Sequence, residues 1–176
     1  MQFRKSPIKG AWVIDIEPLS DERGFFARSF CAREFEKHGL SPSLVQCNLS
    51  YNRRKGTLRG LHCQIPPAAE PKLVRCTAGA IYDVIVDLRP DSPGYLRHFG
   101  VELTAENRRA LYVPELCAHG FQTLTDDTEV TYQMGAFYQP EFQRGFRYDD
   151  PAFSIQWPLP VSVISEKDLS WDPLEQ

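Results

Sequence analysis

Hydrophobic and polar residues alternate along most of this chain in short runs, which is the periodicity of strands that bury one face. In the first run, residues 11–18, Trp12, Ile14 and Ile16 fall on one face. Only residues 31–39 suggest a helix, and a short one. We therefore predict a single all-β domain over residues 1–176, either a sandwich or a closed barrel such as a jelly roll. The further strands are expected at 45–50, 55–64, 72–77, 80–89, 99–103, 109–114, 119–124 and 129–137.

The composition is that of an ordinary globular protein, with 42% hydrophobic and 24% charged residues. No apolar run approaches the roughly 20 residues that span a bilayer, and the N-terminus lacks the apolar core of a signal peptide, so we expect a cytoplasmic protein without a membrane partner. A net charge of -3 disfavours a nucleic-acid partner. The five cysteines are odd in number and widely spaced, which indicates buried thiols rather than disulfides or a zinc site.

The run 55–64 is unusual because it places Arg59 and His62 inside a stretch of strand-forming residues. Side chains two apart share a face of a strand, so His62 is expected on the face of Gly60 and Gln64, with Arg59 on the other face. A histidine held on a rigid strand beside a glycine is placed to meet a ligand. The alternative is a core histidine whose hydrogen bonds are satisfied by the protein.

Other ionisable residues interrupt the strands that follow, namely Lys72, Asp83, His119 and Tyr132. Asp83 alternates into a face of isoleucines, where a carboxylate is costly without a nearby donor such as a histidine or a lysine. If these faces line one interior, the cavity holds two histidines, a lysine, a tyrosine and an aspartate, with an arginine at its mouth. Ionisable groups that share an apolar cavity indicate a functional site.

This set of side chains suits proton transfer at a carbon acid. A neutral histidine can remove a proton, a tyrosine can return one from another direction, and a lysine can stabilise the enolate oxygen between the two steps. No G-x-G-x-x-G or Walker A pattern occurs. Metal-binding β-barrels commonly carry two histidines one residue apart, whereas His62 is followed by Cys63 and Gln64. We therefore expect neither a metal nor a cofactor.

Two further stretches are candidates for substrate binding. Arg23 precedes a turn at Gly24, and the aromatic pair Phe25 and Phe26 follows that turn. An arginine held beside aromatic rings suits a phosphate and a flat base, although the rings could equally pack in the core. Gln46 and Asn48 share one face of a strand and offer a hydrogen-bonding edge, unless that face is turned to solvent.

Ten motifs occur in the order of one known family, and the chain resembles the dTDP-4-dehydrorhamnose 3,5-epimerases from end to end. The motifs are D-E-R-G-F-F (21–26), Q-C-N-L-S (46–50), G-T-L-R-G-L-H-C-Q (56–64), K-L-V-R-C-T-A-G (72–79), D-V-I-V-D-L-R (83–89), L-Y-V-P-E-L-C-A-H-G-F (111–121), the strand with Tyr132, F-Y-Q-P-E (137–141), D-D-P-A-F-S-I-Q-W-P (149–158) and S-E-K-D (165–168).

The resemblance implies a cupin-type jelly-roll β-barrel with one or two short peripheral helices, a homodimer, and a nucleotide-linked 4-keto-6-deoxy-hexose as substrate, most simply a dTDP sugar. It implies that His62 abstracts the proton and Asp168 orients it, that Lys72 stabilises the enolate, and that Tyr132 reprotonates the opposite face. The substrate-binding residues that it implies are Arg23, Phe26, Arg28, Gln46, Asn48, Arg59, His119, Tyr138, Gln143 and Lys167.

Three positions depart from the family pattern. Arg28 and Gln143 stand where the family usually has glutamate, and Cys63 stands where it usually has tyrosine. The first two bear on substrate recognition, so a CDP- or GDP-linked sugar and inversion at a single carbon stay open as alternatives. A catalytically silent sugar-nucleotide binding protein and a metal-dependent oxygenase of the same fold are the rivals from other classes.

Overall fold

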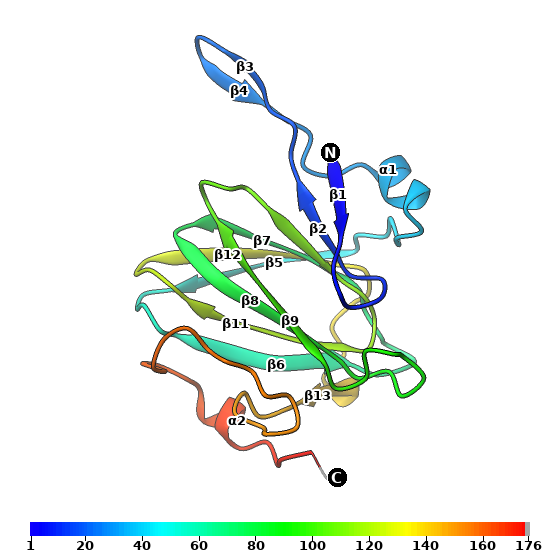
Figure 1. Cartoon of the computed structure of the whole chain (residues 1–176), viewed down its shortest axis with the longest axis vertical. Coiled ribbons are helices and arrows are strands. Elements are labelled where there is room, and N and C mark those ends of the chain that lie inside the picture. Colours follow the sequence, from blue (N-terminus) through cyan, green and yellow to red (C-terminus); the bar gives the residue numbers. More distant parts are fainter. Residues whose placement is uncertain (175–176) are drawn as a thin grey trace.

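The computed structural model describes residues 1–174, and these form two antiparallel sheets packed face to face (Figure 1). The six-stranded sheet has the order β1 (Gln2–Lys5), β2 (Trp12–Asp15), β10 (Ala110–Val113), β7 (Lys72–Ala78), β12 (Thr128–Met134) and β5 (Gln46–Asn52). The five-stranded sheet has the order β13 (Gln143–Gly145), β6 (Leu58–Gln64), β11 (Cys117–Thr123), β8 (Ala80–Asp87) and β9 (His98–Thr104). The prediction of an all-β fold is confirmed.

The main core lies between the two sheets and is built by the alternation of the strands. Ile81 and Ile85 of β8 pack there against Val74 of β7 and Val130 of β12, and all four are fully buried. Val86, on the other face of β8, belongs instead to a cluster beneath the C-terminal segment. The inward face of β8 is therefore the one that also carries Asp83, as its sequence pattern predicts.

The helices are short and peripheral. The helix α1 (Ala32–Lys37) lies within the predicted run and packs Phe35 against the outer face of the six-stranded sheet. It ends before Gly39, whose positive φ of 70° suits a residue without a side chain. A second short helix, α2 (Glu166–Leu169), agrees with the one or two peripheral helices that the resemblance implies, although the residue pattern located neither it nor the single turn η1 (Pro140–Phe142). Within residues 1–174, no helix has both the length and the apolar character needed to cross a bilayer.

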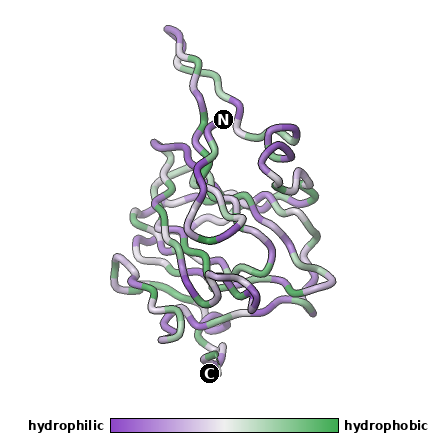
Figure 2. Tube along the Cα trace, turned by 45° about the vertical axis from the view of Figure 1, so that its right-hand side comes forward, coloured by the Kyte–Doolittle hydropathy of each residue, from purple (hydrophilic) through white to green (hydrophobic). Residues whose placement is uncertain are grey.

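A two-stranded hairpin, β3 (Leu19–Asp21) and β4 (Gly24–Phe26), projects away from the body of the protein (Figure 1). It carries hydrophobic positions out into solvent, as the green segments near the top of Figure 2 show. The side chains of Leu19 and Phe26 are 72% and 75% exposed. Of the two readings of this stretch, packing of Phe26 in the core of its own chain is therefore wrong.

Candidate active site

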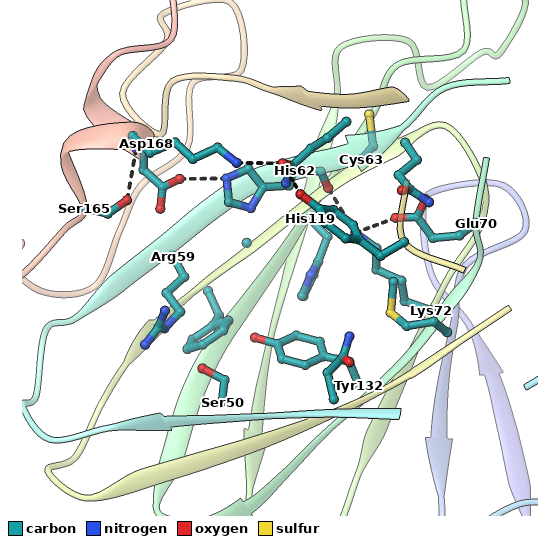
Figure 3. Close-up of a pocket in the computed structure, with 18 residues that line it drawn as sticks. Ser50, Arg59, His62, Cys63, Glu70, Lys72, His119, Tyr132, Ser165 and Asp168 are labelled. Carbon is teal, nitrogen blue, oxygen red and sulfur yellow. Dashed lines mark hydrogen bonds and ion pairs between the residues drawn. The ribbon is translucent and has the colours of Figure 1, made fainter. Parts of the chain in front are cut away.

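A cavity of about 370 Å³ opens between the two sheets, and residues from both sheets line it (Figure 3). It brings together all four of the predicted catalytic residues, His62, Lys72, Tyr132 and Asp168. Six of the predicted substrate-binding residues also line it, namely Asn48, Arg59, His119, Tyr138, Gln143 and Lys167. The predicted shared interior is therefore present, and His62 of β6 and Tyr132 of β12 enter it from opposite sheets.

His62 is held by Asp168, which lies 106 residues later in the chain. The imidazole Nε2 is 2.7 Å from Asp168 Oδ1, and the amide of Gly60 donates to Asp168 Oδ2 at 3.3 Å. Because the neutral ring carries its proton on the nitrogen that donates to the carboxylate, Nδ1 is left as the acceptor. Ser165 holds the backbone of Asp168 in place. Its Oγ accepts a hydrogen bond from the Asp168 amide at 3.0 Å and caps α2.

The charge on Asp168 is stabilised by its partners. Burial alone would raise the pKa of this carboxyl, but the hydrogen bond and charge of His62 and the bond from the Gly60 amide outweigh burial and hold the pKa below its usual value. Asp168 is therefore an anion at neutral pH. A carboxylate in this position can orient a histidine ring and stabilise an imidazolium.

The C-terminal segment that carries Asp168 packs against Gly145. Gly145 of β13 lies directly opposite His62 in the strand register. The ring of Trp171 occupies the place that a side chain at Gly145 would take. A larger residue at this position would displace Trp171 and with it the turn that presents Asp168.

Tyr132 is partly buried between the rings of His119 and Phe121, at centroid distances of 5.9 and 6.3 Å. Burial raises the pKa of the Tyr132 phenol well above its usual value, and the negative charge of Asp83 raises it further. The phenol therefore keeps its proton at neutral pH and can act as a donor.

Asp83 has the partner that its position demands. Its Oδ1 lies 2.7 Å from His119 Nε2, and both side chains are buried. The expectation that Asp83 needs a histidine or a lysine beside it is confirmed.

Arg59 lies in the cavity beside His62, so its predicted place on the opposite face of the strand is wrong. His62 pairs with His119 and Arg59 pairs with Phe121, so three steps along β6 match two along β11. This bulge reverses the alternation. Gly60 allows it, because a Cβ there would lie 2.6 Å from the Cα of Gly120. A glycine inside a strand is a signal of a bulge and could have indicated the reversal.

Four predicted substrate-binding residues do not line this cavity. Arg23, Phe26 and Arg28 belong to the projecting hairpin and the segment after it, and Arg23 and Arg28 pair there with Asp21 and Glu34. Their side chains face solvent in the single chain because the hairpin turns outward at β2 (Figure 1). These three residues therefore do not reach the cavity of their own chain, and their role in substrate binding stays a prediction.

Gln46, the fourth of these residues, supports the cavity without lining it. Its amide donates to Asn48 Oδ1 at 3.1 Å, and its oxygen accepts from the Tyr138 amide at 3.1 Å. Tyr138 in turn donates to Gln143 Oε1 at 3.0 Å, and Lys167 donates to the same oxygen at 2.7 Å. Because Gln143 is uncharged, the positive charge of Lys167 is not neutralised within this group.

Sequence reasoning missed several residues of the cavity wall: Ser50, Gln64, Glu70 and Ser165. Gln64 was expected on the face of His62, and Ser50 follows Asn48 by two residues, so strand alternation could have marked both as site residues. Glu70 lies in a loop, where no periodicity applies. Among residues 1–174, no group of three or more histidine, cysteine, aspartate or glutamate side chains is arranged to hold a metal ion.

The chain is similar to known proteins over nearly its whole length. Residues 5–176 match the family model described as dTDP-4-dehydrorhamnose 3,5-epimerase. The enzyme of that name from Methanothermobacter thermautotrophicus is 43% identical over 99% of this chain and 95% of its own length. A relative named dTDP-4-dehydrorhamnose 3-epimerase, from Streptomyces niveus, is 36% identical over 96% of this chain and 81% of its own length.

Solved structures of members of this family superpose closely on this chain. The Bacillus anthracis 3,5-epimerase, crystallised with TDP and pyrophosphate, superposes with a TM-score of 0.94 at 39% identity, over 98% of this chain and 99% of that one. The Legionella pneumophila epimerase, in complex with dTDP-4-keto-L-rhamnose, gives 0.89 at 38% identity, over 96% and 89%. The predicted cupin-type jelly roll is thereby confirmed. This chain belongs to the dTDP-4-dehydrorhamnose 3,5-epimerase family and is an isomerase of dTDP-4-keto-6-deoxy sugars in deoxysugar biosynthesis.

Proposed function

We propose that His62 and Tyr132 carry the two proton transfers of the epimerisation on opposite faces of the sugar. The observation that supports this assignment is their entry into one cavity from opposite sheets (Figure 3). The ketone acidifies the hydrogens on the carbons next to it. His62 takes one of these protons on Nδ1, and the electron pair of the C–H bond passes into the enolate.

Lys72 stabilises the enolate, and Tyr132 supplies the returning proton. Lys72 lies in the cavity wall, where its positive charge stabilises the enolate oxygen. The enolate oxygen therefore does not have to be protonated. Tyr132 gives its phenolic proton to the opposite face of the carbon, and the configuration inverts. The phenolate then takes a proton from water and the imidazolium loses one, so the protein returns to its starting state.

The nucleotide is assigned to the polar side of the cavity mouth. Arg59 and Lys167 provide positive charge for the diphosphate, Asn48 and Tyr138 provide hydrogen bonds on the nucleotide side, and His119 lies near the sugar. A neutral Gln143 in place of the family's glutamate leaves Lys167 free to pair with a phosphate. The TDP and the dTDP-4-keto-L-rhamnose bound by the two solved relatives support a dTDP-linked substrate for this chain.

The reaction can be followed by incubating the protein with dTDP-4-keto-6-deoxyglucose in deuterated water. We expect deuterium at both carbons that flank the ketone, because both hydrogens are acidified by it, and NMR would count the labelled positions. The CDP- and GDP-linked sugars serve as controls and should exchange more slowly. Label at one carbon only would assign the chain to the single-site epimerases, and no exchange with any of these sugars would contradict the mechanism.

We further propose that the protein acts as a homodimer in which the β3–β4 hairpin of each chain completes the cavity of the other. The support is the exposure of the hairpin's apolar side chains and of Leu49 and Tyr51, 61% and 50%, on the edge strand β5. An open strand edge and an apolar arm are both suited to a second chain. Arg23, Phe26 and Arg28 would then reach a substrate in the partner's cavity.

The exchange of hairpins can be tested by complementation. Co-expressed His62→Ala and Arg23→Ala chains are expected to regain activity, because in mixed dimers one cavity has both its own His62 and an intact Arg23 from the other chain. Random pairing gives about one quarter of the wild-type activity. A matched mixture of His62→Ala and Lys72→Ala should regain none, since both residues belong to the same cavity. Failure of the first mixture to exceed the second would exclude hairpin exchange.

A further inference from the structure

Glu70, in the loop between β6 and β7, is buried beside the proposed enolate-binding lysine. The side chains of Glu70 and Lys72 are 3% and 9% exposed, and both line the cavity (Figure 3). Glu70 Oε1 lies 3.1 Å from Lys72 Nζ. The same ammonium donates to the backbone oxygen of His62 at 3.2 Å. The cation is thus held between a carboxylate and the main chain of the proposed base.

The second oxygen of Glu70 has no hydrogen bond that would offset its burial. Oε2 is buried and has no hydrogen-bond partner among the described residues. A buried carboxylate oxygen without a donor is destabilising, and the ion pair with Lys72 is what compensates the charge of Glu70. Retention of a charge at such a cost points to a use other than stability.

The loop that carries Glu70 is anchored to the rest of the cavity wall. The buried Gln64 of β6 donates from Nε2 to the backbone oxygen of Ala68 at 2.9 Å, and its Oε1 accepts from the Gln139 amide at 2.6 Å. Gln64 lies two residues after His62 on the same strand. The position of Glu70 is therefore tied to the strand that presents His62.

We propose that Glu70 is a positioning residue, which fixes the Lys72 ammonium in the cavity wall before the substrate binds. The inference rests on the proposed role of Lys72 at the enolate oxygen. A lysine tip is a point charge on a flexible stem, so its effect on an enolate depends on where it is held. With Glu70 in place, the cation is already oriented and need not be ordered as the charge develops.

A double-mutant cycle on the full chain tests this role by comparing Glu70→Gln, Glu70→Met, Lys72→Met and the Glu70→Gln/Lys72→Met pair. Glu70→Gln removes the charge and keeps an acceptor of the same shape, whereas Glu70→Met removes both. We expect Glu70→Gln to lower kcat roughly tenfold with KM nearly unchanged, and Glu70→Met to lower it further. The double variant should match Lys72→Met, because Glu70 acts through Lys72. Glu36→Gln, on the exposed face of α1, is the matched control and should behave as wild type.

The outcomes separate this inference from the proposed mechanism. A slow Lys72→Met together with an unaltered Glu70→Gln would overturn the role of Glu70 alone. An equal loss from Glu70→Gln in both backgrounds would show a structural effect independent of Lys72 and would also overturn it. Wild-type activity of Lys72→Met would overturn the assignment of Lys72 itself. Thermal melting of each variant identifies any that is not folded, and Glu70→Gln, which is isosteric, keeps the test open if Glu70→Met is lost.

Discussion

Replacing His62 by alanine is expected to reduce solvent-deuterium incorporation next to the ketone by about 10²- to 10⁴-fold, the usual contribution of a general base. The loss follows because His62, whose Nε2 lies 2.7 Å from Asp168, is the proposed proton acceptor. The second histidine of the cavity, His119, is bound to Asp83 and only 5% exposed. Exchange followed by NMR measures the proton abstraction directly, whichever face receives the returning proton.

A loss of activity in His62→Ala must be distinguished from a loss of fold. Asp168 is buried, and removal of its partner leaves a carboxylate with fewer donors, which is destabilising. His62→Gln keeps an N–H group for Asp168 and lacks a basic nitrogen, so it should be inactive and melt closer to wild type. His38→Ala, at the exposed end of α1, is the matched control and should exchange normally. Exchange at the wild-type rate in His62→Gln would remove His62 from the reaction.

Replacing Tyr132 by phenylalanine is expected to stop inversion while leaving proton abstraction in place. The variant loses only the hydroxyl, whose proton is retained at neutral pH because burial raises the pKa of the phenol above its usual value. His62 can still remove a proton and return deuterium to the same face. The recovered sugar should therefore carry deuterium without inverted configuration, and product formation should fall by about 10²- to 10⁴-fold.

The two halves of this result can be read in one NMR experiment that follows label and configuration together. Tyr95→Phe, a tyrosine that is 44% exposed and does not line the cavity, is the control and should epimerise normally. Loss of exchange along with inversion would place Tyr132 in the abstraction step. Normal inversion would show that the second proton comes from another donor.

Local pattern was sufficient for the main strands of the two sheets and for several of the inward-facing polar residues. The alternation of β8 placed Asp83 among Ile81 and Ile85 and demanded a donor, and the structure supplies His119 at 2.7 Å. The same periodicity placed His62 inward. These features depend only on the two-residue period of a strand and on the cost of burying an unpaired charge, and both can be read from neighbouring residues.

Other assignments came from the family motifs and not from any pattern in the residues. Asp168 lies in a short turn near the C-terminus, and nothing in its surroundings in the sequence marks it as a partner of His62. The structure brings the two together across 106 residues, through the packing of Trp171 on Gly145 and the cap of Ser165. Contacts between loops are set by the shapes of the surfaces that meet, which have no period along the chain.

The sequence by itself determined an all-β protein with a histidine, a lysine and a tyrosine facing one interior, because strand periodicity and charge burial are local constraints. Only the tertiary structure decided that Arg59 shares the cavity with His62, since the bulge depends on how β11 pairs with β6. It also decided that Glu70 lies against Lys72 and that the hairpin with Arg23 points away from its own cavity. Each of these depends on the partner that a segment meets, and residues distant in the chain supply that partner.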